Sequence, residues 1–154
     1  MTTLAGIPVR VVHRLAARDR RTGQAQRASE VLAQIGGLLD GLLECGEGGV
    51  IDLRAIEPGL DHDGLACLEV ALGIGEVHAT VSATGETVVR ETGFPAVWHI
   101  THRDSSGSLR TILIDVSWCP EILHSQRADA EAGQRRLRAK LVSEQAARCS
   151  DGLP

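Results

Sequence analysis

The sequence predicts an α+β fold, a four-stranded antiparallel β-meander packed against two to three α-helices. The first observation is a change in hydrophobic period: apolar residues recur at helical spacing up to position 72 and at every second position from 76 onward. The second is the series of short polar connections between four consecutive extended segments, which is typical of a meander. With 154 residues, the chain fits a single domain that folds without disulfides or metal.

A basic N-terminal arm is predicted over residues 1–28. Within it, Ile7 to Val12 has the composition of a short strand or an extended segment, and Pro8 suits an edge position. Six arginines face a single acid, Asp19; they are Arg10, Arg14, Arg18, Arg20, Arg21 and Arg27. We interpret the arm as a solvated face, with binding of an acidic partner as the alternative.

The strongest predicted helix covers Ser29 to Cys45. Its apolar residues repeat at helical spacing, and Gly46 follows as a C-terminal stop. The apolar stripe consists of Val31, Leu32, Ile35, Leu38, Leu39, Leu42 and Leu43. A second stripe of small residues, Ala33, Gly37 and Gly41, recurs every four positions. Because glycine weakens a helix, this stripe predicts either the close approach of another backbone, as in a homodimer, or tolerated surface glycines.

A shorter helix is predicted over Gly64 to Leu72. Asp63 is placed to cap its N-terminus, and Gly73 and Gly75 to end it. Before this helix, Val50 to Leu53 is a short strand or an extended segment.

The four strands of the meander follow. Val77 to Val81 and Thr87 to Thr92 are joined by a hairpin turn at Thr84-Gly85. Ala96 to His102 and Leu109 to Val116 form the third and fourth strands, joined by a polar loop.

A charged helix and tail are predicted over residues 126–154, so that the domain itself covers 29–125. Helical features begin at Pro120-Glu121, because proline suits the first turn and an acid there complements the helix dipole. The segment from Ile122 to Arg148 is rich in Ala, Arg and Glu with sparse apolar residues, which predicts a long, weakly amphipathic helix.

Composition excludes several classes of protein. The net charge of −4 argues against a general nucleic-acid binder. No apolar run approaches the roughly 18 residues that a membrane span needs, and no secretory signal begins the chain, so we expect a cytoplasmic protein without membrane insertion. The four cysteines form no CxxC pair, and we expect free, mostly buried thiols; they are Cys45, Cys67, Cys119 and Cys149. Cys45 and Cys149, which are terminal to helices, are the candidates for exposure.

No nucleophile elbow, phosphate loop, dinucleotide fingerprint or HExxH sequence occurs, so we expect neither an enzyme nor a cofactor. Histidines raise the question of a metal site. On the period-two pattern, His78 and His99 share a sheet face with Glu91 and Asp115 if the strand register permits. The interpretation that we favour places His78 and His99 on a half-exposed polar sheet face without metal, and Asp61 and Asp63 serve as turn and cap residues before the next helix.

Aromatic residues are rare and clustered. The chain has two Trp, one Phe and no Tyr, and Phe94 and Trp98 lie together beside Gly93 and Pro95. These side chains and Trp118 are either core fillers or, in part, an anchor for another protein. The two interpretations are compatible.

Four stretches in fixed order resemble the C-terminal domain of the HyaF/HupH-type NiFe-hydrogenase expression and maturation proteins. They are Gly73-Ile74-Gly75-Glu76-Val77, Gly85-Glu86, Glu91 to Trp98, and Cys119-Pro120-Glu121-Ile122-Leu123. The resemblance covers about Leu38 to His124. Three positions depart from the family pattern: Ala96 stands where glycine is frequent, His99 where a second Trp is common, and Cys119 where an aliphatic residue precedes Pro-Glu-Ile-Leu.

The resemblance implies a non-catalytic accessory role in hydrogenase assembly. In this role the protein holds the small, iron–sulfur subunit before maturation and export, alongside other maturation proteins. The partner-binding residues that we expect are Glu91, Phe94, Pro95, Val97, Trp98, Pro120 and Glu121. Two alternatives stay open: a metal- or cluster-handling protein that uses His78, His99 and Cys67 or Cys119, and a non-catalytic oligomeric adaptor.

Overall fold

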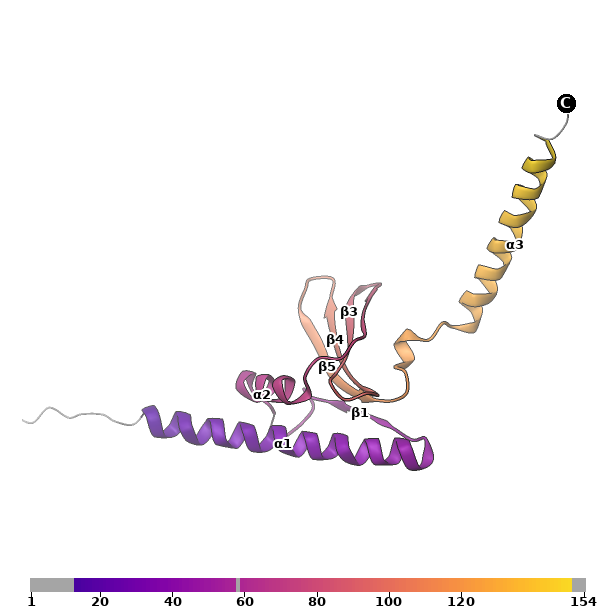
Figure 1. The fold of residues 1–154 in the computed structure, drawn as a ribbon. Coiled ribbons are helices and arrows are strands. Elements are labelled where there is room, and N and C mark those ends of the chain that lie inside the picture. Colours follow the sequence, from indigo (N-terminus) through magenta and orange to yellow (C-terminus); the bar gives the residue numbers. More distant parts are fainter. Residues whose placement is uncertain (1–12, 58, 151–154) are drawn as a thin grey trace, which may run out of the picture. The chain divides into compact units, whose positions relative to one another are not determined.

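The computed structural model describes residues 13–57 and 59–150. The chain divides into two units, Met1–Trp118 and Cys119–Pro154. The first unit holds two helices, α1 (His13–Cys45) and α2 (His62–Leu72), and a sheet (Figure 1). The second holds a 3-10 turn, η1 (Glu121–Leu123), and a helix, α3 (Arg127–Ser150).

The sheet has five antiparallel strands in the order β1-β5-β4-β3-β2. Their bounds are β1 Gly49–Asp52, β2 His78–Ser82, β3 Gly85–Glu91, β4 Val97–Asp104 and β5 Leu109–Val116. Strands β2 to β5 form the predicted meander, so the α+β fold class is confirmed. The fifth strand, β1, pairs with β5 and places Val50 opposite Asp115. Four residues were too few for the sequence to distinguish a strand from an extended segment.

Helix α1 begins at His13, well before the predicted Ser29. Buried residues continue the helical spacing towards the N-terminus, with Gln24 and Ala28 preceding Val31. The arginines in this region are good helix formers, and helix propensity prevails over the polarity that suggested an arm. The strand predicted over residues 7–12 lies outside the described residues.

Helix α2 is capped by Asp61 and not by the predicted Asp63. The Asp61 carboxylate accepts a hydrogen bond from Gly64 N at 3.0 Å, and its backbone is extended, as an N-cap requires. Asp63 therefore lies in the first turn. The helix ends as predicted, with Gly73 at φ 67° donating its N–H to Glu69 O.

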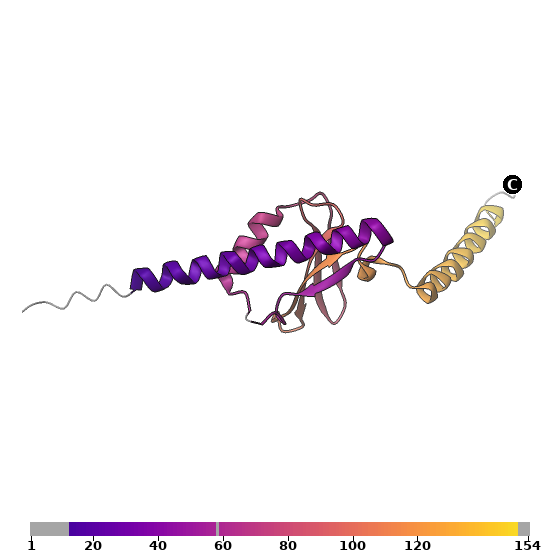
Figure 2. The same ribbon diagram turned by 90° about the horizontal axis from the view of Figure 1, so that it is seen from below.

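Both α1 and α2 lie on the same side of the sheet (Figures 1 and 2). Helix α1 packs against α2 and β5. Apolar side chains of the two helices and of one sheet face form the core between them; they are Ala28, Val31, Ile35, Leu42, Leu53, Leu68, Leu72, Val97, Ile112, Ile114 and Val116. The predicted helical stripe, apart from the exposed Leu43, thus meets the period-two strands as expected.

The opposite sheet face carries a second group of buried side chains. Val89 of β3 pairs with Ile100 of β4, and both are buried. Trp98 follows on the same face and donates its indole N–H to Ser117 O at 2.9 Å. A strand alternates its side chains between faces, so Trp98 cannot share the helix-covered core with Val97.

The small-residue stripe on α1 has a local explanation at one position. A Cβ on Gly41 would lie 2.9 Å from Glu47 O, in the loop that follows the helix. A Cβ on Gly37 would meet no atom within 4 Å. Of the two expectations, close approach therefore applies at Gly41, and a tolerated surface glycine at Gly37.

The second unit differs from the predicted continuous helix. Pro120-Glu121 opens the short turn η1, His124 is extended, and the helix proper starts at Arg127. Helix α3 carries an ion pair between Arg127 and Glu131 at 2.9 Å. Within the described residues, no helix is long and apolar enough to cross a membrane.

Candidate functional site: a cleft and an aromatic corner

A cleft opens between the C-terminal half of α2 and the facing ends of β3 and β4. Its volume is about 570 Å³, and most of its lining is apolar. The lining residues are Ala66, Glu69, Val70, Leu72, Gly73, Ile74, Arg90, Glu91, Thr92 and His99. Two aliphatic residues at the cleft, Val70 and Ile74, remain 84% and 86% exposed.

Backbone contacts between two distant stretches build one wall of this cleft. Gly93 N donates to Leu72 O at 2.8 Å, and Gly75 N donates to Glu91 O at 3.0 Å. A Cβ on Gly75 would lie 2.3 Å from Thr92 O, so only glycine permits this approach. The glycine-containing stretches that were noted in the sequence therefore meet in space.

The polar part of the cleft consists of three side chains from three elements. Arg90 of β3 is the cross-strand neighbour of His99 on β4, and its Nη2 donates to His99 Nδ1 at 3.0 Å. Because arginine has no acceptor, Nδ1 must accept and the neutral imidazole carries its proton on Nε2. Glu69 of α2 lies 3.9 Å from Arg90 Nη2 and 4.0 Å from His99 Nε2. Both distances exceed hydrogen-bond length.

Burial lowers the pKa of His99 below its ordinary value. The neighbouring Arg90 cation lowers this pKa further, and the Glu69 carboxylate offsets part of the effect. The imidazole is therefore neutral at pH 7, with an N–H donor directed at the region of Glu69.

A second hollow of about 440 Å³ adjoins the first. The two share five lining residues, Ala66, Glu69, Leu72, Arg90 and His99. The Glu69, Arg90 and His99 cluster is thus common to both hollows and is accessible from each.

Beside the cleft, the chain turns sharply through residues 92–97. Thr92 Oγ1 accepts from Phe94 N at 3.2 Å, and Thr92 N donates to Val97 O at 2.9 Å. Ala96 has φ 68°, the one positive value found for a non-glycine residue in the described chain. Ser117 N donates to Ala96 O at 3.0 Å, which brings Trp118 next to this turn. We call the turn with Trp118 the aromatic corner.

Only part of the predicted partner-binding set is accessible at the aromatic corner. Phe94 is 48% exposed, Trp118 is 65% exposed, and Pro95 is also exposed. Val97 is fully buried in the core and Trp98 exposes only 7% of its surface, so both support the corner from beneath. The sequence suggested Trp118 as an anchor for another protein, but Trp118 is not among the expected partner-binding residues.

Three other predicted site residues lie outside the turn at residues 92–97. Glu91 lines the cleft, where its Cβ and Cγ lie against Gly75. Pro120 and Glu121 belong to the second unit, in which Pro120 is buried and Glu121 is exposed at the start of η1.

The register settles the question of the shared histidine face. His78 and His99 do share it, but Arg90 stands between them, paired with each across the strands. Glu91 and Asp115 are opposite Trp98, on the other face. An arginine cation between two imidazoles is unfavourable for a shared metal ion.

Cysteines do not complete a metal site in the described parts of the chain. Among residues 13–57 and 59–150, no group of three or more His, Cys, Asp or Glu is placed to hold a metal ion. Cys45, Cys67 and Cys119 are free thiols, and all three are exposed. The expectation of buried thiols is wrong for Cys67 and Cys119, because their helix flank and loop positions face away from the core. Cys45, at the end of α1, is exposed as its terminal position allows.

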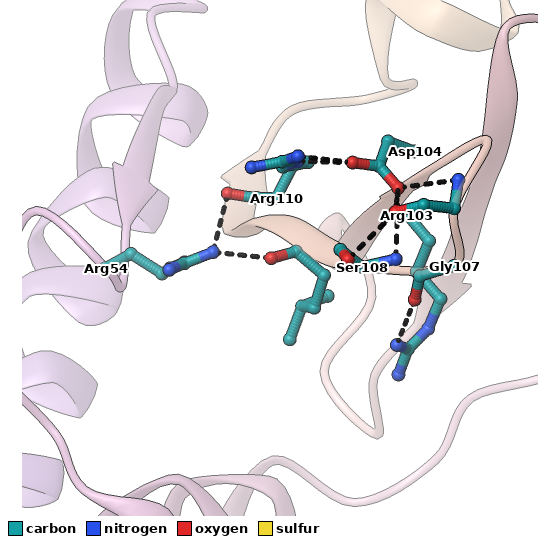
Figure 3. Close-up of polar contacts among 8 residues, drawn as sticks. Arg54, Arg103, Asp104, Gly107, Ser108 and Arg110 are labelled. Carbon is teal, nitrogen blue, oxygen red and sulfur yellow. Dashed lines mark hydrogen bonds and ion pairs between the residues drawn. The ribbon is translucent and has the colours of Figure 1, made fainter.

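A further polar cluster surrounds the β4–β5 loop (Figure 3). Asp104 accepts from the backbone N–H groups of Ser106 and Ser108 at 2.9 and 3.0 Å, and Arg110 Nε donates to it at 2.6 Å. Hydrogen bonds hold the pKa of Asp104 well below its usual range, and the bond from the Ser106 hydroxyl has the largest effect. Arg54 donates to the carbonyls of Leu109 and Arg110 (Figure 3). The sequence predicted this loop but not its link to Arg54.

Comparison with known proteins decides the family. Residues 25–143 match the family described as HupH hydrogenase expression protein, C-terminal conserved region. The chain belongs to this HupH family. A solved structure, the hydrogenase expression protein HupH from Thiobacillus denitrificans ATCC 25259, has 38% sequence identity and a TM-score of 0.71 over 76% of this chain and 96% of that one. Comparison with curated proteins gives no significant match.

The family membership confirms the resemblance drawn from the sequence. Two of the HupH-like stretches, Gly73 to Val77 and Glu91 to Trp98, supply the cleft wall and the aromatic corner. The departure at Ala96 falls on the residue with positive φ, where glycine carries no steric penalty. The departure at His99 falls on the floor of the cleft.

Proposed function

We propose that this HupH-family chain is a non-catalytic assembly chaperone that binds the iron–sulfur small subunit of a NiFe hydrogenase. The observation that carries the proposal is the exposure of Phe94 and Trp118 at one corner of a chain with only three aromatic residues. Exposed aromatic side chains are enriched among the residues that dominate protein interfaces. Family membership supports hydrogenase as the system that supplies the partner.

In this proposal the aromatic corner is the partner-binding surface. Phe94, Pro95 and Trp118 make the contact, and the buried Val97 and Trp98 hold the turn in place. Glu91, Pro120 and Glu121 remain proposed contributors to partner binding. Other maturation proteins are further proposed partners that join while the small subunit is held before export.

Affinity isolation from cells that express the complete hydrogenase operon tests this function. The tagged chain should retain the small-subunit precursor. Mass spectrometry identifies the retained protein, so the test does not depend on a measurement of hydrogenase activity. The matched control is the same isolation from cells that lack the small-subunit gene. Retention of other operon proteins without the small subunit, in cells that contain it, would contradict the proposal.

A further inference from the structure

The cleft between α2 and the β3–β4 face is distinct from the aromatic corner and has the features of a binding site of its own. One wall is aliphatic, and Glu91 lines the cleft as a second acidic residue beside Glu69. The side chains of Arg90 and His99 offer hydrogen-bond donors at one place on the floor. His99 has a side-chain exposure of 9%, so its donor can be reached only through the hollows. A mostly apolar hollow with a few convergent polar groups is the usual form of a ligand site.

An internal carboxylate marks the position of an anion in this cleft. Glu69 lies within 4.0 Å of both Arg90 Nη2 and His99 Nε2, but it is hydrogen-bonded to neither. Its side chain is 58% exposed and so is free to turn towards solvent. A pair of this kind contributes little to stability, because both charges remain hydrated.

The aliphatic wall indicates what accompanies the anion. Val70 and Ile74 lie at the cleft and face solvent over most of their surface. An enclosed small-molecule site would cover such residues, whereas a wall this open suits a segment of another protein.

We propose that the cleft binds a protein segment in which an acidic side chain stands beside aliphatic side chains. The carboxylate replaces Glu69 at the guanidinium of Arg90 and the Nε2–H of His99, and the aliphatic groups cover Val70 and Ile74. Glu69 acts as an internal competitor that occupies the anion position until the segment arrives. This inference does not rest on the proposed chaperone function.

The test uses three synthetic pentapeptides and NMR titration of the full ¹⁵N-labelled chain. The peptides are acetyl-Ala-Leu-Glu-Leu-Ala-amide and its counterparts with Gln or Lys in the central position. The backbone amides of Gly73 and Ile74, at the edge of the cleft, report binding. We expect the Glu peptide to bind at least about fivefold tighter than the Gln peptide, and the Lys peptide most weakly.

Two substitutions should act in opposite directions. Glu69→Gln removes the competitor and should tighten binding of the Glu peptide about threefold or more, whereas Arg90→Gln should abolish the preference for Glu over Gln. Arg127→Gln is the matched control, because it removes an Arg–Glu pair in the second unit and should change nothing. Unchanged amide dispersion in each variant verifies folding.

Three results would overturn the inference. Tighter binding of the Lys peptide would assign the cleft to a basic segment held by Glu69. Weaker binding of the Glu peptide by both Glu69→Gln and Arg90→Gln would show that the Glu69, Arg90 and His99 cluster has only a structural role. If the amide resonances of Gly73 and Ile74 do not shift with any of the three peptides at millimolar concentration, the cleft is not a binding site for such segments. Phe94→Ala with Trp118→Ala should leave the titration unchanged, which separates this test from that of the chaperone.

Discussion

At the scale of single residues, Ala96 carries a backbone conformation that suits glycine. Its φ of 68° costs an L-residue about 1 kcal/mol, and the turn holds it there through the bond from Ser117 N to Ala96 O. Ala96→Gly should therefore raise the free energy of unfolding by up to about 1 kcal/mol, since relief of strain exceeds the added freedom of the unfolded chain.

Urea denaturation measures this change as a higher midpoint. Ala66→Gly, on an exposed position of α2, is the matched control and should lower stability by about 1 kcal/mol. Equal destabilisation by the two glycines would show that the turn does not strain Ala96.

His99 should make the fold sensitive to acid. Its pKa is lowered by burial and by Arg90 on β3, with partial compensation from Glu69 on α2; His78 faces the same row from β2. The folded state thus disfavours the proton that the unfolded chain binds. The contribution of the neutral His99 to the free energy of unfolding is fully present above about pH 6.5. Below this pH it is lost by at most about 1.4 kcal/mol per pH unit, until the pKa of the folded state is reached.

The urea midpoint between pH 7.5 and 5 measures this effect. It should fall more steeply for the wild type than for His99→Gln, whose side chain gains no proton. The exposed His62 and His78 are present in both proteins and cancel in the comparison. Parallel pH profiles for the two proteins would show that His99 is not held neutral by the fold.

At the scale of elements, the N-terminus of α2 depends on one carboxylate. Asp61 accepts from Gly64 N, so Asp61→Ala should cost about 1 kcal/mol of stability. Asp63→Ala, in the first turn, removes only a favourable charge near the helix dipole and should cost a few tenths of a kcal/mol. Thermal unfolding of the two variants side by side checks the order, and a larger loss from Asp63→Ala would restore that residue as the cap.

The periodic elements were predictable because local physics determines them. The helical stripe that contains Val31 and Ile35 and the period-two pattern from residue 77 survive in the structure, as does the glycine stop at Gly73. The choice between Asp61 and Asp63 was not predictable, since both are good caps two residues apart. Local reasoning offered a strand or an extended segment at Val50 to Leu53, but it could not predict the pairing of β1 with β5, because that pairing is a long-range contact.

In the candidate site too, the sequence predicted the local features but not those that depend on long-range contacts. The sequence identified the stretch Glu91 to Trp98, and it indicated that His78 and His99 share one sheet face if the strand register permits. It could not place Arg90 between the two histidines, because this depends on register. It could not bring Glu69 to His99 either, since that contact depends on how α2 packs on the sheet.

At the scale of the whole molecule, family and surface point the same way. The HupH match and the related structure define the domain, whose core is formed by α1, α2 and one sheet face. The other features, an exposed aromatic corner and an aliphatic cleft with a polar floor, are separate surfaces built from adjoining stretches of chain. The proposed chaperone function assigns the binding of the partner to the aromatic corner.

The aromatic corner should carry the binding energy for the hydrogenase small subunit. Loss of two interface aromatics commonly costs at least about 2 kcal/mol, or roughly thirtyfold in affinity. Leu43→Ala is a matched control, because Leu43 is 69% exposed, much like Trp118, but lies near the end of α1.

The most direct test is quantitative capture of the small-subunit precursor by three forms of the purified chain at equal concentration: wild type, Phe94→Ala with Trp118→Ala, and Leu43→Ala. We expect the wild type and Leu43→Ala to capture equal amounts, and the double variant, folded by circular dichroism, to capture roughly thirtyfold less at limiting concentration. Undiminished capture by the double variant, or no capture by the wild type, would contradict the proposal that the aromatic corner binds the small subunit.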